Sequence, residues 1–249
     1  MNDIRRELSV ERFEELAKEI QRPEMPLSVR AAHRLRLFLE EESIVKQPGE
    51  RIPCWRTLIS FPDIYAEGER ESLQGGHYIH EQGRVCNLSS DWEGVISEGL
   101  MPRRNMAEEN LKNGVGDADF LKAAIITVDA VIAYADRYEN AALSRAVRYG
   151  AEHFEDALQL MRVLHFALWA SNVYHNTLGR FDQYMWPYLK NDLAEAVLDE
   201  SGALSLLEEF FLSFNRDSDL TRPLSSRHFL WTPVMQHKHN GLPSGLVLF

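Results

Sequence analysis

Apolar side chains recur at spacings of three and four residues along much of this sequence, which is the pattern of amphipathic helices. The clearest case is residues 119–138, whose apolar positions are Leu121, Ala124, Ile125, Val128, Val131, Ile132, Ala135 and Tyr138. A second helix is predicted over residues 153–170, and because residues 163–169 are apolar almost all round, we expect it to be buried on most sides. Further helices are predicted at 11–21, from Pro26 onward, and at 91–99, 180–197 and 201–214.

Residues 44–65 interrupt the helical pattern. Pro48, Pro53 and Pro62 fall within this segment, and each removes a backbone donor and clashes with a helical turn. We therefore predict extended strand or loop here.

The composition of the chain is that of an ordinary globular protein, with 45% hydrophobic and 26% charged residues among 249. The net charge of −11 argues against non-specific binding to nucleic acid or to an anionic membrane. No apolar run is long enough to span a bilayer, and the first residues lack the apolar stretch of a signal peptide. With only two cysteines, we expect a cytoplasmic protein.

The residues that could perform chemistry form no recognised catalytic or metal-binding motif. His77 and His80 lie close in sequence, as do His237 and His239, but neither pair has a cysteine or carboxylate at a metal-binding spacing. We therefore expect no metal site. His165 is expected to be a hydrogen-bonded core histidine.

The two cysteines, Cys54 and Cys86, have apolar neighbours and are expected to be inert buried thiols. Phosphate-binding glycine loops, a nucleophile elbow and a Cys-x-x-Cys motif are absent from the sequence. The residues by themselves therefore indicate a helical protein with no recognisable active site.

Residues 175–188 read His-Asn-Thr-Leu-Gly-Arg-Phe-Asp-Gln-Tyr-Met-Trp-Pro-Tyr. This resembles the Gly-Arg-Phe-Asp-Gln-Tyr-x-x-Pro-Tyr segment of glycyl radical enzymes, the pyruvate formate-lyase-like family. Residues 76–93, 154–159 and 208–220 resemble other segments of that family, in the same order. The resemblance covers about residues 20–220.

The resemblance implies a ten-stranded α/β barrel wrapped by helices. We therefore expect a mainly α fold with some β, corresponding to an incomplete N-terminal part of that barrel. It also implies radical C–C or C–X bond cleavage of a small-molecule substrate, as in formate acetyltransferase (pyruvate formate-lyase), choline lyases and diol dehydratases. No cofactor is bound directly in such enzymes. The glycyl radical is installed by an S-adenosylmethionine-dependent activating enzyme, and a homo-oligomer is an open expectation.

Neither radical-bearing motif of the family occurs in this sequence. There is no Gly-Cys-[Val/Ile]-Glu string for the thiyl cysteine and no Arg-Val-x-Gly-Tyr-like string for the glycyl radical, since Cys54 lies in Pro-Cys-Trp and Cys86 in Val-Cys-Asn. No catalytic residue is therefore assigned. We expect a truncated member of the family that is inactive alone; the alternative is a non-catalytic helical module that binds a homologous or complementary chain.

Four polar side chains in the matched region are candidates to face the barrel interior and bind substrate: Arg56, His80, Asn87 and Arg180. Arg180 and Asp182 are expected to form a buried ion pair that ties a helix to the barrel. Alternatively, Arg180 binds a substrate carboxylate through two hydrogen bonds.

The sequence changes character near residue 220. All 38 acidic residues precede residue 221, whereas residues 221–249 hold three basic residues, three histidines and three prolines. We divide the chain into a family-like part (1–220) and an off-pattern tail (221–249), for which a frameshift is the favoured explanation and a divergent sequence the alternative. The tail is expected to be poorly packed.

An incomplete barrel exposes one apolar face and unpaired strand edges. We therefore expect a large apolar surface at residues 163–169 and around Phe210, Phe211 and Phe214.

Overall fold

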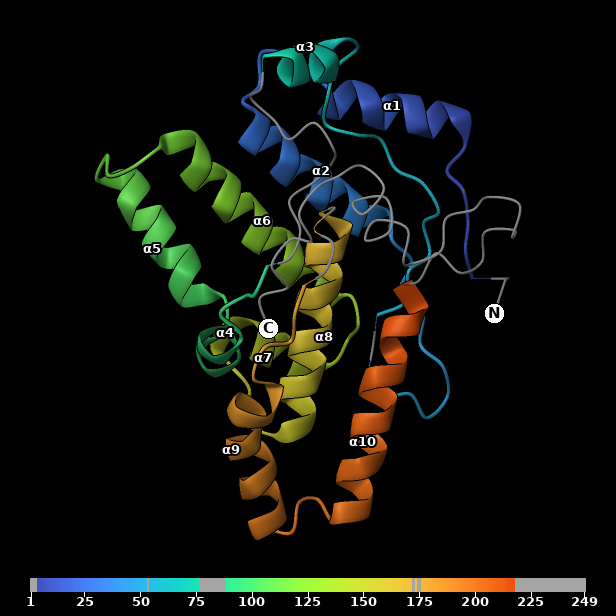
Figure 1. The fold of residues 1–249 in the computed structure, drawn as a ribbon, viewed down its shortest axis with the longest axis vertical. Helices are drawn as coiled ribbons and strands as arrows, with labels where there is room; N and C mark the ends of the chain where they lie inside the picture. Colours follow the sequence, from blue (N-terminus) through green and yellow to red (C-terminus); the bar gives the residue numbers. More distant parts are fainter. Residues whose placement is uncertain (1–3, 53, 77–87, 172, 174–175, 218–249) are drawn as a thin grey trace, which may run out of the picture.

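The computed structural model describes residues 4–52, 54–76, 88–171, 173 and 176–217. These ranges form ten α-helices and a short 3₁₀ helix (Figure 1). The elements are α1 Val10–Ile20, α2 Leu27–Glu41, α3 Glu69–Gly75, α4 Trp92–Glu98, α5 Met101–Lys112, α6 Ala118–Asp136, α7 Ala141–Tyr149, α8 Phe154–Ala170, α9 Phe181–Ala194, α10 Glu200–Ser213 and η1 Phe214–Asp217. None of the described helices is long and apolar enough to cross a membrane. The expected tail, 221–249, lies outside the described residues.

The predicted contribution of β-structure is wrong for the described part of the chain. Only two isolated bridges occur there, Arg6 with Leu58 and Ser89 with Thr177, so the described residues contain no sheet and no part of a strand barrel.

The extended segment around residues 50–58 uses side chains instead of a neighbouring strand to satisfy its backbone. The Glu42 carboxylate accepts the N–H groups of Thr57 and Leu58 at 2.8 and 3.2 Å. The Glu209 carboxylate likewise accepts the N–H of Ile52 at 2.8 Å. Because these donors already have acceptors, no strand partner is required.

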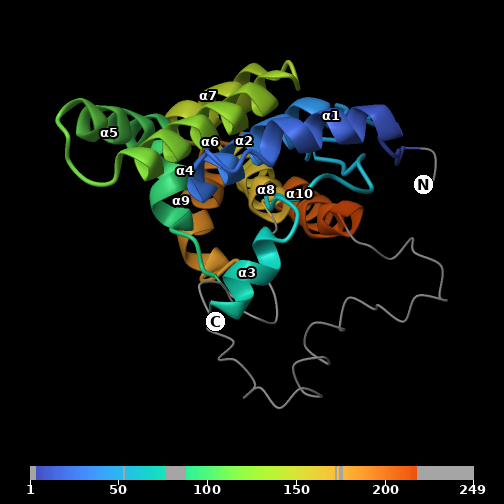
Figure 2. The same ribbon diagram turned by 90° about the horizontal axis from the view of Figure 1, so that it is seen from above.

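Helix α8 lies at the centre of the molecule and is buried on nearly all sides, as predicted. Figure 2 shows α2, α6 and α7 above it and α9 and α10 on either side of it, and α8 contacts all five. Leu158, Val163 and Phe166 have no exposed surface. The core therefore closes around this helix.

The apolar surface expected from an open half-barrel is largely absent at the predicted places. Residues 163–169 are buried or half-buried, and Phe210 is fully buried. Phe211, by contrast, is 50% exposed. The helices packed around α8 cover the apolar stretch without any barrel strand.

All seven predicted helices are present, and several begin at a side-chain cap. The Asp91 carboxylate accepts the N–H of Gly94 and begins α4, as expected. Along α6, burial is strongest from Ala130 onward, whereas the first half of the helix is mostly half-buried. Helix α5 was not predicted because its sequence carries no continuous apolar stripe.

Two glycines allow α4 and α7 to pack against each other at close range. Gly99 and Gly150 have positive φ angles of 72° and 97°. A Cβ atom would lie 2.3 Å from the Arg148 backbone at Gly99, and 2.1 Å from the Ser97 carbonyl oxygen at Gly150. Any larger residue would therefore force these two helix ends apart.

The start of α8 is joined to the end of α9 by His153 and Asp192. His153 Nδ1 lies 2.8 Å from Asp192 Oδ1, and the Phe154 N–H donates to Asp192 Oδ2 at 2.7 Å. Asp192 is buried. Its hydrogen bond with His153 raises the pKa of that imidazole above its usual range.

This contact predicts a pH-dependent contribution to stability. Because the pKa of His153 is raised by folding, the stabilisation is complete below about pH 6.5, the unfolded value, and is lost as pH rises through the folded pKa. Since the imidazole is half-exposed, the effect is at most about 1 kcal/mol. Urea unfolding of the parent and His153→Gln between pH 6 and 9 measures it. The two curves should converge as pH rises; a constant difference across this range contradicts the assignment.

Candidate functional site

Arg56, one of the four predicted site residues, is turned into the protein. Its Nε donates to the Leu58 carbonyl at 2.9 Å and its Nη2 to the Ile59 carbonyl at 3.0 Å. The guanidinium also lies 4.4 Å from the centroid of the Trp169 ring. These contacts hold the extended segment against the end of α8.

Arg180 and Asp182 form the predicted ion pair, with Nη2 and Oδ2 3.0 Å apart. The expectation that it is buried is wrong, because the two side chains are 68% and 70% exposed. The pair lies at the first turn of α9, on the outer surface. Burial is decided here by which side of the turn faces the core.

His80 and Asn87 lie outside the described residues, as do Cys86 and His77. Of the four predicted residues, the structure therefore places only Arg56, which is buried, and Arg180, which is exposed. In the part of the chain that it describes, no three His, Cys, Asp or Glu side chains are placed to share a metal ion.

A buried arginine on α8, Arg162, was not anticipated from the sequence. Arg162 is fully buried. Its Nε donates to Ser213 Oγ at 2.8 Å, and its Nη2 donates to the carbonyls of Ser213 and Cys54 at 3.2 and 3.4 Å. Arg162 thus joins α8 to the end of α10 and to the extended segment. Cys54 is buried, as predicted.

One turn further along α8, His165 lies beside the loop that leads into α9. Its ring packs edge-on against Phe214, with the centroids 4.7 Å apart. Burial, with a smaller effect of Arg162, lowers the pKa of His165 to about 4, and a hydrogen bond with the Asn176 backbone opposes this. His165 is therefore neutral at pH 7.

Three polar atoms in this region are buried and have no hydrogen-bond partner among the described residues: His165 Nδ1, Asn176 Oδ1 and Thr177 Oγ1. The expectation that His165 is fully satisfied is thus wrong at Nδ1. Leaving such an atom unpaired costs about 1–3 kcal/mol, so a cluster of three is rare in a purely structural core.

The backbone around this cluster is well ordered by hydrogen bonds. The Thr177 N–H donates to the Leu88 carbonyl at 3.0 Å, and Trp92 Nε1 donates to the Thr177 carbonyl at 2.8 Å. Asn176 Nδ2 donates to the Val173 carbonyl at 2.9 Å, which leaves its Oδ1 available. The three atoms can therefore accept a hydrogen bond from, or donate one to, a further polar group. We take this polar cluster (His165, Asn176 and Thr177) as the candidate site.

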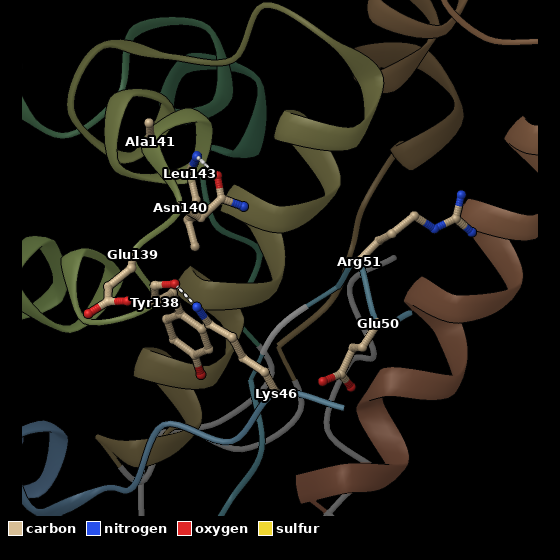
Figure 3. Close-up of a pocket in the computed structure, with 8 residues that line it drawn as sticks. All are labelled: Lys46, Glu50, Arg51, Tyr138, Glu139, Asn140, Ala141 and Leu143. Atoms are coloured by element: carbon tan, nitrogen blue, oxygen red, sulfur yellow. Dashed lines mark hydrogen bonds between the residues drawn. The ribbon is translucent and has the colours of Figure 1, made fainter. Parts of the chain in front are cut away.

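A cleft of about 420 Å³ lies between the loop at Lys46–Arg51 and the start of α7 (Figure 3). The ammonium of Lys46 donates to the Tyr138 carbonyl. Glu50 accepts from Trp55 Nε1 at 2.8 Å and pairs with Arg216 at 2.6 Å. Arg51 extends toward α10, where it pairs with Glu209. Lys46, Glu50 and Arg51, which line this cleft, therefore already have partners among the described residues.

Comparisons with known proteins agree on one family. Residues 140–237, which include the polar cluster, match the pyruvate formate lyase-like family. An isethionate sulfite-lyase of Nitratidesulfovibrio vulgaris (strain Hildenborough) is 27% identical over 162 residues, covering 52% of this chain and 20% of the relative. The chain thus spans about a fifth of the length of that relative.

Solved structures share the fold. The glycerol-bound form of the B12-independent glycerol dehydratase from Clostridium butyricum superposes with a TM-score of 0.68 at 21% identity. The match covers 87% of this chain and 38% of the dehydratase. A glycyl radical enzyme from Archaeoglobus fulgidus superposes with a TM-score of 0.66 at 18% identity, covering 85% and 39% of the two chains.

If the Thr177 hydroxyl has no structural partner, its removal should not destabilise the protein. We expect Thr177→Val to leave the free energy of unfolding unchanged or to raise it by up to about 1 kcal/mol. Thr57→Val is the matched control, because Thr57 Oγ1 contacts the Glu42 carboxylate and accepts the Ser43 N–H at 3.0 Å. That variant should lose about 1–3 kcal/mol. Urea unfolding measures both, and an equal loss in the two variants would show that Thr177 has a structural partner.

Proposed function

We propose, from the match of residues 140–237 to the pyruvate formate lyase-like family, that this chain provides substrate-contacting groups of a radical lyase without catalysing the reaction alone. The polar cluster supports this proposal most directly. Its three unpaired buried atoms are suited to hold a small, hydroxyl-bearing molecule.

The chemistry of the cluster fits a neutral polar substrate. A substrate hydroxyl can donate to Asn176 Oδ1 and accept from the Thr177 hydroxyl. Neutral His165 adds a ring nitrogen without adding charge, because its pKa is about 4. One matched structure is described as glycerol-bound, and glycerol is a ligand of this kind.

In the family, the stored radical supplies the removal of a hydrogen atom from the substrate. The residues of this chain would bind and orient that substrate and keep water away from it. The proposed substrate is cleaved at a C–C or C–X bond, and activation requires an S-adenosylmethionine-dependent enzyme as a partner.

The 249-residue polypeptide is proposed to be inactive by itself because it contains neither radical-bearing motif. Cys54 does not replace the missing thiyl cysteine. Its side chain is fully buried and lies beside the Tyr138 hydroxyl, which leaves no room for a substrate carbon at its sulfur.

Electron paramagnetic resonance tests the inactivity. The purified chain, incubated anaerobically with a radical-activating enzyme and S-adenosylmethionine, should give no glycyl doublet and no lyase product. A full-length family member activated in parallel is the positive control. A doublet assigned to this polypeptide overturns the proposal.

Substrate recognition is tested separately by nuclear magnetic resonance. Adding glycerol should shift the ring signals of His165 with a dissociation constant of about 10 mM, as expected for so small a ligand. The fully methylated ether of glycerol is the control ligand, since it lacks hydroxyl donors, and His153 is the control residue. Equal shifts with both ligands, or no shift at His165, would argue against recognition by this cluster.

A second function remains a proposal of its own: a helical module that binds a homologous or complementary chain. One observation favours it, namely the exposed apolar and acidic face of α10. Leu204 and Phe211 on this helix are 58% and 50% exposed.

A further inference from the structure

Helix α10 presents an apolar stripe that the described part of the protein does not cover. Leu204 and Phe211 are exposed, and Leu207 between them is half-buried. Their spacing of three and four residues places them on one face. The opposite face, with Ala203, Leu206 and Phe210, is buried against the core. Figure 1 shows α10 at an edge of the molecule, beside α8.

The stripe is held in a fixed shape by the aromatic rings beneath it. Phe211 lies 5.6 Å from Phe181 and 5.3 Å from Phe210, measured between ring centroids. A partner docking on Phe211 therefore meets a ring that is already ordered, which reduces the entropy lost on binding.

The stripe lies in the most acidic stretch of the described chain. Residues 191–215 contain six carboxylates and no lysine or arginine. Asp192 contacts His153 and Glu209 pairs with Arg51. Glu200 and Glu208 enter no ion pair among the described residues.

Glu208 is placed where it can form an ion pair with a basic side chain of a partner. It follows Leu204 by four residues and precedes Phe211 by three, so it borders the stripe directly. Leu212, which is 63% exposed, lies four residues beyond it. A partner that buries Leu204 and Phe211 will therefore bring the side chains beside its own apolar stripe close to the Glu208 carboxylate.

We propose that this α10 face (Leu204, Leu207, Glu208 and Phe211) is a docking surface for an amphipathic helix of a second polypeptide, with lysine or arginine beside its apolar stripe. Apolar side chains at i, i+3 and i+7 would fill the stripe, which is the helix-in-groove mode of recognition. Basic flanks would pair with Glu208 and Glu200. A second copy of this chain is disfavoured, because a symmetric contact would oppose acidic faces.

This inference rests on the interaction role proposed above and not on radical chemistry. A glycyl doublet on this polypeptide would overturn the radical proposal. Absence of selective helix binding would overturn the docking proposal. The two results are independent of each other.

The test uses the full chain and two fluorescein-labelled synthetic helical peptides. Both carry leucine at i, i+3, i+7 and i+10; one has lysine and the other glutamate at the flanking positions. Fluorescence anisotropy should show at least tenfold tighter binding of the lysine peptide at low salt. The preference should shrink as salt increases, because the flanking contacts are at the surface.

Three variants locate the binding to α10. Phe211→Ser should weaken the lysine peptide at least tenfold, and Glu208→Lys should weaken the lysine peptide while strengthening the glutamate peptide. Phe120→Ser is the matched control, since Phe120 is 64% exposed but lies at the start of α6. It should change neither affinity. Thermal melting checks that each variant is folded, and the exposed Glu208→Lys change tests the site even if Phe211→Ser is unstable.

Three results would overturn the proposal. The first is equal affinity for the two peptides, or no binding of either. The second is binding that Glu208→Lys and Phe211→Ser leave unchanged. The third is sedimentation of the unmodified chain as a dimer that Phe211→Ser dissociates, which would identify a second copy as the occupant of this face.

Discussion

Helix α8 has to be covered on every side, and the arrangement of the other helices follows from that requirement. Its apolar side chains point in all directions, so a helix left half in water would expose Leu158 or Phe166. Helices α2, α6 and α7 cover one side, and α9 and α10 flank α8 to the left and right (Figure 2).

The two buried basic side chains of α8 show how a structural polar group differs from a candidate binding group. Arg162 is surrounded by acceptors from Ser213 and Cys54, and so joins three segments together. His165, only one turn away, has a buried ring nitrogen without a partner in the described structure, and so do Asn176 and Thr177 beside it. The first arrangement explains why the fold holds together. The second leaves hydrogen-bonding capacity that the described residues do not use.

The described residues solve the backbone hydrogen-bonding problem without a sheet. Carboxylates on α2 and α10, or next to them, take N–H groups that a strand would otherwise satisfy. Using Glu42 and Glu209 in this way ties the extended segment to two helices at once. It also leaves Glu208 and the stripe on the far side of α10 free for an external partner.

The positions of most helices were determined by the sequence, because an apolar spacing of three and four and a cap such as Asp91 act over a few neighbouring residues. The resemblance to the pyruvate formate lyase-like family was also evident from the sequence, since residues 175–188 resemble its motif in one continuous run. Tertiary structure decided the rest. Whether residues 44–65 pair as strands depends on a distant partner, and here the Glu42 and Glu209 side chains take that place. The Arg180–Asp182 pair forms locally, but only the packing of α9 decides that it faces outward.

Phe210 and Phe211 are identical neighbours in the sequence, yet one is buried and the other exposed, because burial depends on which surface of α10 meets α8. For the same reason the unpaired atom of His165 could not be foreseen: a missing partner is a property of all the segments that surround it.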